Sequence, residues 1–277
     1  MTHSGKIGVI TGATSGIGAQ AALSMAQSGF HLVLPVRNID KGEAVKIAIK
    51  QVAREAQVDL MHCDLSSMES IREFSKKFND KYHRLDVLIN NAGVWESVRK
   101  TSADGIELTF AVNHLAPFLM TNLLIDKLKK SAPASIITVS SDAHKMGRMN
   151  FNDLEGKTNW STLASYAQSK LANVLFTRKL AQNLEGSGVV ANCLHPGFVA
   201  TQLFERFPAF LVKALSLFMI NPRKGAETIV YLATNPDIQN LNGQYFYKKK
   251  ARKISVGAQN PDDAEKLWSI SKVYAGI

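Results

Sequence analysis

The chain has 277 residues, of which 45% are hydrophobic and 20% are charged. This balance is that of an ordinary globular protein, and it excludes a disordered or collagen-like chain. Lys and Arg number 33 against 23 Asp and Glu, a formal net charge of +10 that indicates an anionic partner such as a phosphorylated cofactor, a lipid surface or nucleic acid. Only two cysteines occur, which excludes a disulfide framework and predicts a reducing, cytoplasmic location.

The N-terminus and the apolar stretches predict no membrane span. Residues 1–6 are polar and run directly into a strand-like stretch, which leaves no room for a signal peptide. The longest strongly apolar stretch, residues 207–220, is interrupted by Pro208 and Lys213 and is shorter than the ~20 residues that span a bilayer. A basic run at 248–253 is interpreted as a solvated face, because it lacks the interleaved aromatic residues of nucleic-acid binders.

Short β-branched runs alternate with longer helical patterns along the chain. In chain order, the apolar spacing predicts strand 7–10, helix 17–28, strand 31–36, helix 41–55, strand 58–63, helix 68–82, strand 85–89, helix 111–129, strand 135–139, helix 163–184, strand 189–194 and strand 243–247. Strands that are apolar on successive residues are buried on both faces, which is typical of parallel sheets covered by helices. No repeat or linker interrupts the pattern. We therefore expect a single α/β domain over residues 1–277, a Rossmann fold with a doubly wound parallel sheet of about seven strands and helices on both faces.

A glycine-rich turn, residues 11–18, lies between the first strand and the first helix. Glycines at this position let backbone N–H groups approach a pyrophosphate at the helix N-terminus. The spacing is Gly-x-x-x-Gly-x-Gly, which differs from the general dinucleotide fingerprint, so a plain turn packed against a helix stays open as the alternative.

Arg37 and Asn38 follow the second strand, where a chain that binds NAD would carry an acidic residue. A guanidinium suits a 2′-phosphate, whereas a carboxylate would repel it. The sequence therefore predicts NADP(H) as the cofactor, with an exposed loop arginine as the alternative.

Tyr166 and Lys170 are four residues apart within a predicted helix, so phenol and ammonium share one face. A free tyrosine has a pKa of about 10, and a nearby cation lowers it toward the range of a useful acid or base. A tyrosine and a lysine at this spacing also occur by chance, as a pair of surface residues.

Three further motifs lie at the ends of predicted strands, at 90–93, 140–141 and 196–197. The carboxyl ends of parallel strands line one ligand-binding crevice, so we expect these motifs to lie close together.

Together the motifs resemble those of the short-chain dehydrogenase/reductase family over essentially the whole chain. The resemblance is carried by 11–18, 90–93, Asn113, Ser141, Tyr166 with Lys170, and 196–197. Within the family, four stretches are similar to the retinol dehydrogenase-like branch, which includes the WW-domain-containing oxidoreductases. They are residues 37–42, 110–118, 169–176 and 267–271.

The resemblance implies a role for each site residue. Tyr166 exchanges a proton with the substrate oxygen, and Lys170 lowers the pKa of that tyrosine and holds the nicotinamide ribose. Ser141 binds the carbonyl oxygen, Asn113 holds a water in a proton relay toward Lys170, and Ser140 is structural because adjacent strand residues face opposite ways. Asp64 meets the adenine edge. The cofactor-binding set is Gly12, Thr14, Ser15, Gly16, Ile17, Gly18, Arg37, Asn38, Asp64, Leu65, Asn91, Ala92, Gly93, Tyr166, Lys170, Pro196, Gly197, Val199 and Thr201.

These roles predict an NADP(H)-dependent oxidoreductase that interconverts a carbonyl and an alcohol on a lipophilic substrate such as retinal, an aldehyde or a ketone. Residues up to about 140 form the cofactor half, residues 141–277 the catalytic and substrate half, and the apolar segment 198–220 a lid. Two alternatives stay open: a carbon–carbon double-bond reductase of the protochlorophyllide reductase type, and a non-catalytic NADP(H) sensor or scaffold. We expect no metal and no nucleic acid. Peripheral membrane contact and a homodimer are also left open.

Overall fold

The computed structural model describes residues 3–198 and 220–277, and the eight strands of this part of the chain form one sheet. Their order is β3-β2-β1-β4-β5-β6-β7-β8, with all neighbours parallel except the antiparallel pair β7–β8. The strands are β1 (Ile7–Ile10), β2 (His31–Val36), β3 (Val58–His62), β4 (Val87–Asn90), β5 (Ala134–Val139), β6 (Val189–His195), β7 (Tyr245–Tyr247) and β8 (Lys250–Arg252). The predicted α/β class and doubly wound parallel sheet are confirmed.

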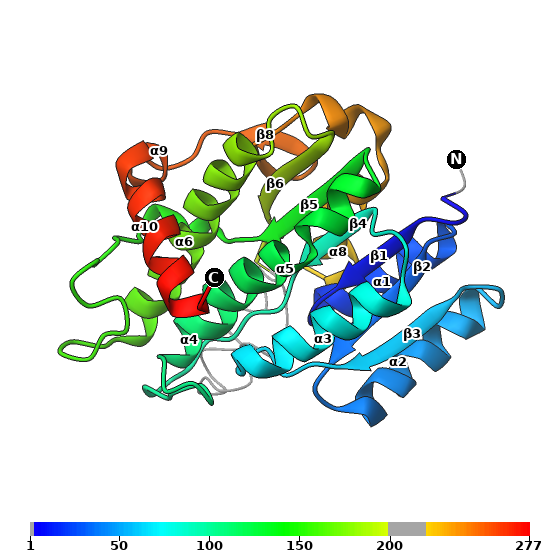
Figure 1. The fold of residues 1–277 in the computed structure, drawn as a ribbon, viewed down its shortest axis with the longest axis horizontal. Coiled ribbons are helices and arrows are strands. Elements are labelled where there is room, and N and C mark those ends of the chain that lie inside the picture. The colour runs from blue at the N-terminus through cyan, green and yellow to red at the C-terminus, as the bar shows by residue number, and fades with distance from the viewer. Residues whose placement is uncertain (1–2, 199–219) are drawn as a thin grey trace.

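Helices cover both faces of the sheet. The helices α1 (Gly16–Gln27), α2 (Ile39–Val52) and α8 (Pro222–Thr234) pack on one face. The helices α3 (Met68–Lys81), α5 (Ala116–Lys130) and α6 (Thr162–Asn183) pack on the other. Figure 1 shows α5 and α6 in front of the sheet, α8 behind it, and α10 (Pro261–Ala275) lying along α6. The remaining helical segments are α4 (Leu108–Phe110), η1 (Ala111–Leu115), η2 (Asp142–Lys145), η4 (Pro236–Asn240) and α9 (Val256–Gln259).

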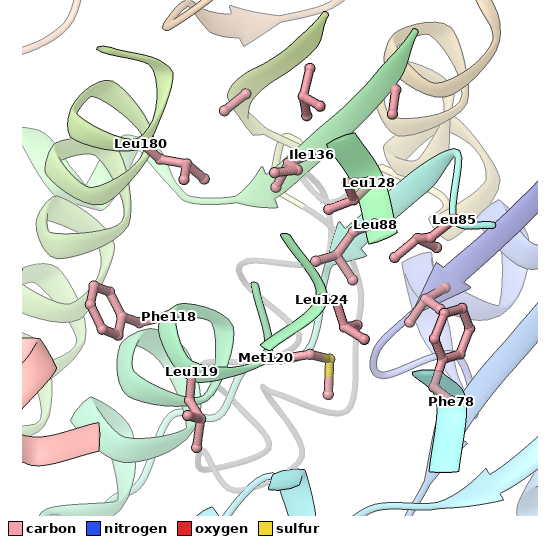
Figure 2. Packing of buried hydrophobic residues seen from close by; sticks show 14 of the residues in the cluster. Phe78, Leu85, Leu88, Phe118, Leu119, Met120, Leu124, Leu128, Ile136 and Leu180 are labelled. Atoms are coloured by element: carbon pink, nitrogen blue, oxygen red, sulfur yellow. The ribbon is translucent and has the colours of Figure 1, made fainter. Parts of the chain in front are cut away.

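One core cluster lies between the sheet and α3, α5 and α6 (Figure 2). Leu124 and Leu128 of α5 pack with Leu88 of β4 and Ile136 of β5, and all four side chains are at most 1% exposed. Burying such a side chain contributes about 1.5–3 kcal/mol. This packing fixes the central strands, and with them the strand ends that carry the predicted site residues.

The strand order reverses between β1 and β4, since β1 pairs with β2 on one side and with β4 on the other. In an open α/β sheet, ligands bind in the crevice outside the carboxyl ends of the strands at such a reversal. The glycine turn follows β1, and the motif at 90–93 begins at the last residue of β4. The topology therefore brings these two motifs to the same crevice.

The structure differs from the sequence prediction at three places. The described part of the chain has eight strands instead of about seven. The additional strand, β8, falls inside the basic run, and its exposed Lys and Arg side chains give no apolar pattern from which a strand is predicted. The helix predicted at 111–129 extends from Leu108 to Lys130 and contains a π-helical turn. No helices were predicted at α8, α9 and α10. The predicted lid, which includes Val199 and Thr201, falls almost wholly on 199–219, outside the described residues.

Within the described residues, one helical run is long and apolar enough, by length and composition alone, to cross a membrane. This run, Leu108–Lys130, is mostly buried inside the protein. Its hydrophobicity is accounted for by its place in the core.

Candidate active site

The glycine turn after β1 packs directly against the end of β4. Gly12 has a φ of 66°, and a Cβ atom there would lie 2.8 Å from the Cα atom of Ala92. A Cβ atom on Gly18 would collide with the carbonyl oxygen of Gly12. Glycine is therefore required at both positions by backbone conformation and close approach.

The side chains of Thr11 and Asn91 tie these two segments together. Thr11 Oγ1 accepts hydrogen bonds from the backbone N–H groups of Asn91 and Ala92, at 2.9 and 3.1 Å. Asn91 Nδ2 donates to the carbonyl of Thr11 at 2.9 Å. The Asn91 side chain thus helps to hold the glycine turn against the end of β4.

The N-terminus of α1 opens onto this turn. Ser15 occupies the N-cap position in an extended conformation, and its exposed side chain forms no capping hydrogen bond. The first N–H groups of a helix have no partner within the helix and attract anions. Thr14, Ser15, Gly16 and Ile17 therefore fit a pyrophosphate placed at this end of the helix.

The ends of β2 and β3 carry the residues predicted to select the cofactor. Arg37 follows β2 directly and is exposed. Asn38 caps α2 by accepting a hydrogen bond from the backbone N–H of Lys41 at 2.9 Å. Asp64, followed by Leu65, lies beyond the end of β3 and accepts two hydrogen bonds from Ser66 through Oδ1. These hydrogen bonds of Asn38 and Asp64 fix the backbone after β2 and β3. The Arg37 guanidinium is an accessible cation at this position.

Ser141, Tyr166 and Lys170 meet at the end of β5. The Ser141 side chain lies beside Tyr166 and acts to lower its pKa, and the ammonium of Lys170 lies 5.6 Å from the centroid of the Tyr166 ring. Lys170 Nζ also donates to the carbonyl of Val139 at 3.1 Å. Ser140 points away from this group and donates to the backbone carbonyl of Lys170 at 2.8 Å. The structure thus brings together the predicted acid–base residues and separates the two serines.

Burial shifts the pKa values of both residues on α6. It raises the pKa of Tyr166 to about 12, against the opposing effect of the Ser141 hydrogen bond, and it lowers the pKa of Lys170 to about 8. The expected lowering of the Tyr166 pKa is wrong for this structure, because the burial of the phenol outweighs the effect of Ser141. At neutral pH the phenol holds its proton and most of the Lys170 population is charged.

Asn113 lies in the π-helical turn beside Lys170, and such turns are frequent at functional sites. Its amide is bonded to Val94 at both atoms: Oδ1 accepts from the Val94 N–H at 2.7 Å, and Nδ2 donates to the Val94 carbonyl at 3.0 Å. A Cβ atom on Gly93 would lie 3.3 Å from Asn113 Oδ1 and 3.4 Å from Lys170 Nζ. The glycine therefore leaves space between the two polar groups. The water-holding role of Asn113 stays a prediction.

Sequence reasoning missed Trp95. Its indole stacks on the Tyr166 ring with centroids 4.5 Å apart and an interplanar angle of 9°. The residue stands two positions after the motif at 90–93 and belongs to none of the recognised motifs. The signal in the sequence that could have found it is that Trp95 is an aromatic residue close to the end of a predicted strand.

His144 holds the backbone of Ser141. Its Nδ1 lies 2.8 Å from the Ser141 carbonyl, and its Nε2 lies 3.3 Å from the backbone N–H of Ser255. Because Nε2 must accept from that N–H, the proton resides on Nδ1, and burial lowers the pKa of His144. His195, at the end of β6, stacks on Tyr247 at 5.2 Å, and burial lowers its pKa to about 4. Both rings are neutral at physiological pH and packed against the protein.

The segment after β6 begins with Pro196 and Gly197 at the same edge of the sheet. Gly197 has a φ of 97°, and the next residue, Phe198, accepts a backbone hydrogen bond from Ile220 at 2.7 Å. This bond joins the two ends of the described chain on either side of residues 199–219.

A doubly wound sheet with an anion-binding glycine turn and a Ser–Tyr–Lys group at one edge defines a nucleotide-dependent oxidoreductase.

Comparisons with known proteins agree with this class. A family model described as short chain dehydrogenase matches residues 6–210. Human retinol dehydrogenase 13 is 40% identical over 285 residues, which cover 100% of this chain and 86% of that protein. Human retinol dehydrogenase 11 is 40% identical over 275 residues, which cover 99% of this chain and 86% of that protein. The chain belongs to the short-chain dehydrogenase family, whose enzymes use NAD(P)(H), and the predicted relation to retinol dehydrogenases is confirmed.

Solved structures show the same fold. A protein from Mycobacterium paratuberculosis described as uncharacterized has a TM-score of 0.82 and 30% identity, over 99% of this chain and 95% of that one. A protein from Beutenbergia cavernae with bound NADP has a TM-score of 0.73 and 25% identity, over 89% of this chain and 96% of that one.

Proposed function

We propose that this oxidoreductase interconverts a carbonyl and an alcohol on a lipophilic substrate with NADP(H) as the hydride carrier. The observation that carries the proposal is the grouping of Ser141 with Tyr166, whose pKa it lowers, and with Lys170 one helical turn further along α6. This group can bind one oxygen atom with two hydroxyl donors and deliver a proton to it. A cofactor-binding protein without catalysis has no need of such a pair.

In the direction of reduction, NADPH would supply the hydride that adds to the carbonyl carbon. Ser141 Oγ and Tyr166 Oη both donate hydrogen bonds to the carbonyl oxygen and polarise it. As the carbon–oxygen double bond becomes a single bond, the Tyr166 O–H bond breaks and its proton passes to the oxygen. The raised pKa of Tyr166 keeps this proton available. Lys170 stabilises the phenolate that remains and offers its ammonium to the nicotinamide ribose.

Arg37 supports NADP(H) over NAD(H). Its exposed guanidinium stands at the end of β2, where the adenine ribose lies in dinucleotide-binding folds, and it suits a 2′-phosphate. Thr14, Ser15 and the first turn of α1 would hold the pyrophosphate, and Asp64 the adenine edge.

A lipophilic substrate is supported by the relatives and by the sequence of residues 198–220. The relatives are named retinol dehydrogenases, and this segment contains only three charged residues, Glu205, Arg206 and Lys213. Each CH₂ group that a substrate buries contributes about 0.8 kcal/mol.

The test is turnover of retinal, aliphatic aldehydes and ketones with NADPH, measured by loss of its absorbance. We expect kcat/KM to rise with each methylene in an aldehyde series up to the size of the pocket. A flat series or a preference for polar substrates would contradict the lipophilic substrate class. Reduction of an enone only at its carbon–carbon double bond would favour the alternative reductase.

A further inference from the structure

The hydroxyl of Ser141 is oriented by the short helix that follows it. Ser141 is the N-cap residue of η2, and its Oγ accepts a hydrogen bond from the backbone N–H of Ala143 at 3.2 Å. Because a backbone N–H only donates, this bond occupies a lone pair of Oγ and keeps the hydroxyl hydrogen as a donor for another atom. The position of this donor therefore depends on the backbone at the start of η2.

The imidazole of His144 fixes that backbone. The residue is 0% exposed, and its Nδ1 lies 2.8 Å from the Ser141 carbonyl, which also accepts the backbone N–H of His144 at 3.0 Å. A carbonyl oxygen only accepts, so Nδ1 donates. On the other side of the ring, Nε2 accepts from the backbone N–H of Ser255 at 3.3 Å. One neutral ring thus joins the residue that carries the hydroxyl to a segment far along the chain.

Tyr245 of β7 restricts the movement of this ring and of the first residue of η2. Its ring contacts the imidazole of His144, with centroids 4.7 Å apart and an interplanar angle of 58°. Its hydroxyl donates to Asp142 Oδ1 at 2.8 Å. Tyr245 is itself only 3% exposed, so the sheet holds the imidazole in the orientation that serves the Ser141 carbonyl.

We propose that His144 is a positioning residue, whose Nδ1–H holds the Ser141 backbone so that the hydroxyl meets the substrate oxygen. The two ring nitrogens then have separate tasks. The donor at Nδ1 orients the catalytic serine, and the acceptor at Nε2 attaches the segment at Ser255. The inference rests on the proposed function, because it concerns the group that binds the carbonyl oxygen in that reaction.

Two substitutions separate these tasks, since each keeps one of the two hydrogen bonds of the ring. His144→Asn can place an amide N–H near the position of Nδ1 and removes the acceptor, whereas His144→Gln can place an amide oxygen near the position of Nε2 and removes the donor. With decanal and NADPH, we expect His144→Gln to lower kcat by about 10²-fold, the cost of a small misplacement of a reacting group. His144→Asn should retain most of the kcat, although both variants lose one hydrogen bond and should melt at similar temperatures.

A double-mutant cycle tests whether His144 acts through Ser141. Adding His144→Gln to Ser141→Ala should cause little further loss of kcat, because the hydroxyl to be oriented is already absent. NADPH affinity should stay the same in all these variants. His83→Gln makes the same substitution at an exposed histidine and should leave kcat unchanged.

Three outcomes decide the inference. Equal losses of kcat in the asparagine and glutamine variants, or losses that multiply in the double variant, would show that His144 only stabilises the fold and would overturn its positioning role. If His144→Gln does not fold, His144→Leu, which also removes the Nδ1 donor, takes its place in the cycle. Absence of turnover in the unmodified enzyme would overturn the proposed function itself, and the inference with it.

Discussion

The cofactor end and the catalytic end of the predicted site differ in whether backbone or side chains form them. At the cofactor end, after β1 to β3, the shape comes from backbone: a glycine turn, a helix N-terminus and capped loops, with Arg37 exposed. At the catalytic end, after β5, the chemistry depends on polar side chains packed into the protein, and Lys170 is only 3% exposed. An exposed residue can change without disturbing the fold, whereas a buried polar group couples function to stability. The comparison predicts that cofactor choice and catalysis respond differently to substitution.

The largest effect should follow removal of the Tyr166 hydroxyl. Tyr166→Phe keeps the ring that stacks on Trp95 and should lower kcat by about 10²- to 10⁴-fold, the usual contribution of a general acid. NADPH affinity and the melting temperature should persist. Near-normal kcat in this variant would contradict the assignment of the proton donor.

The two adjacent serines should separate function from stability. Ser141→Ala removes a donor to the reacting oxygen and should lower kcat by about 10²- to 10³-fold. Ser140→Ala removes the bond to the Lys170 carbonyl and should cost about 0.5–1.5 kcal/mol in the free energy of unfolding, with a much smaller loss of kcat. Steady-state kinetics and denaturant unfolding of both variants test the pair, and equal kinetic losses would remove the distinction.

Arg37→Asp should raise the dissociation constant of NADPH by about 10- to 150-fold, from the loss of a hydrogen bond to a charged group, and should leave that of NADH nearly unchanged. Arg54→Asp makes the same charge change at an exposed position beyond the C-terminal end of α2. It serves as the control for a general loss of positive charge. Calorimetric titration measures both constants, and equal affinities of the unmodified protein for the two cofactors would refute the role of Arg37.

The smallest effect should be a pH dependence of cofactor affinity. Burial lowers the pKa of Lys170 from 10.5 to about 8, so the ammonium loses its proton above about pH 8 and NADPH binding should weaken there. Between pH 8 and 10.5 the free energy of unfolding should instead increase with pH. The reason is that the unfolded state binds the Lys170 proton more tightly than the folded state does.

Lys170→Met is the control for this titration. It should bind NADPH weakly at every pH and lack the change near pH 8. An affinity of the unmodified protein that stays constant from pH 7 to 10 would show that the charge of Lys170 does not contribute to binding.

The sequence predicted the parts of this protein that depend on local pattern. Apolar runs located the strands of the parallel sheet, and alternation along the end of β5 separated Ser140 from Ser141. The pattern failed where a property depends on the assembled fold. The pKa of Tyr166 rises because of burial that no spacing reveals, and the stack with Trp95 joins residues 71 positions apart. Strand β8 was missed because two of its three residues are charged, and its pairing with β7 is visible only in three dimensions.

The C-terminal helix α10 also supports the site. Helix α10 buries Ala264, Leu267 and Ser271, and the hydroxyl of Ser271 lies 2.8 Å from Nε2 of the fully buried His114. His114 is the neighbour of Asn113 in the π-helical turn. Residues more than 150 positions along the chain therefore support the turn whose amide holds the loop before Trp95. Shortening the chain at its C-terminus would remove this support and impair turnover without altering any group that touches the substrate.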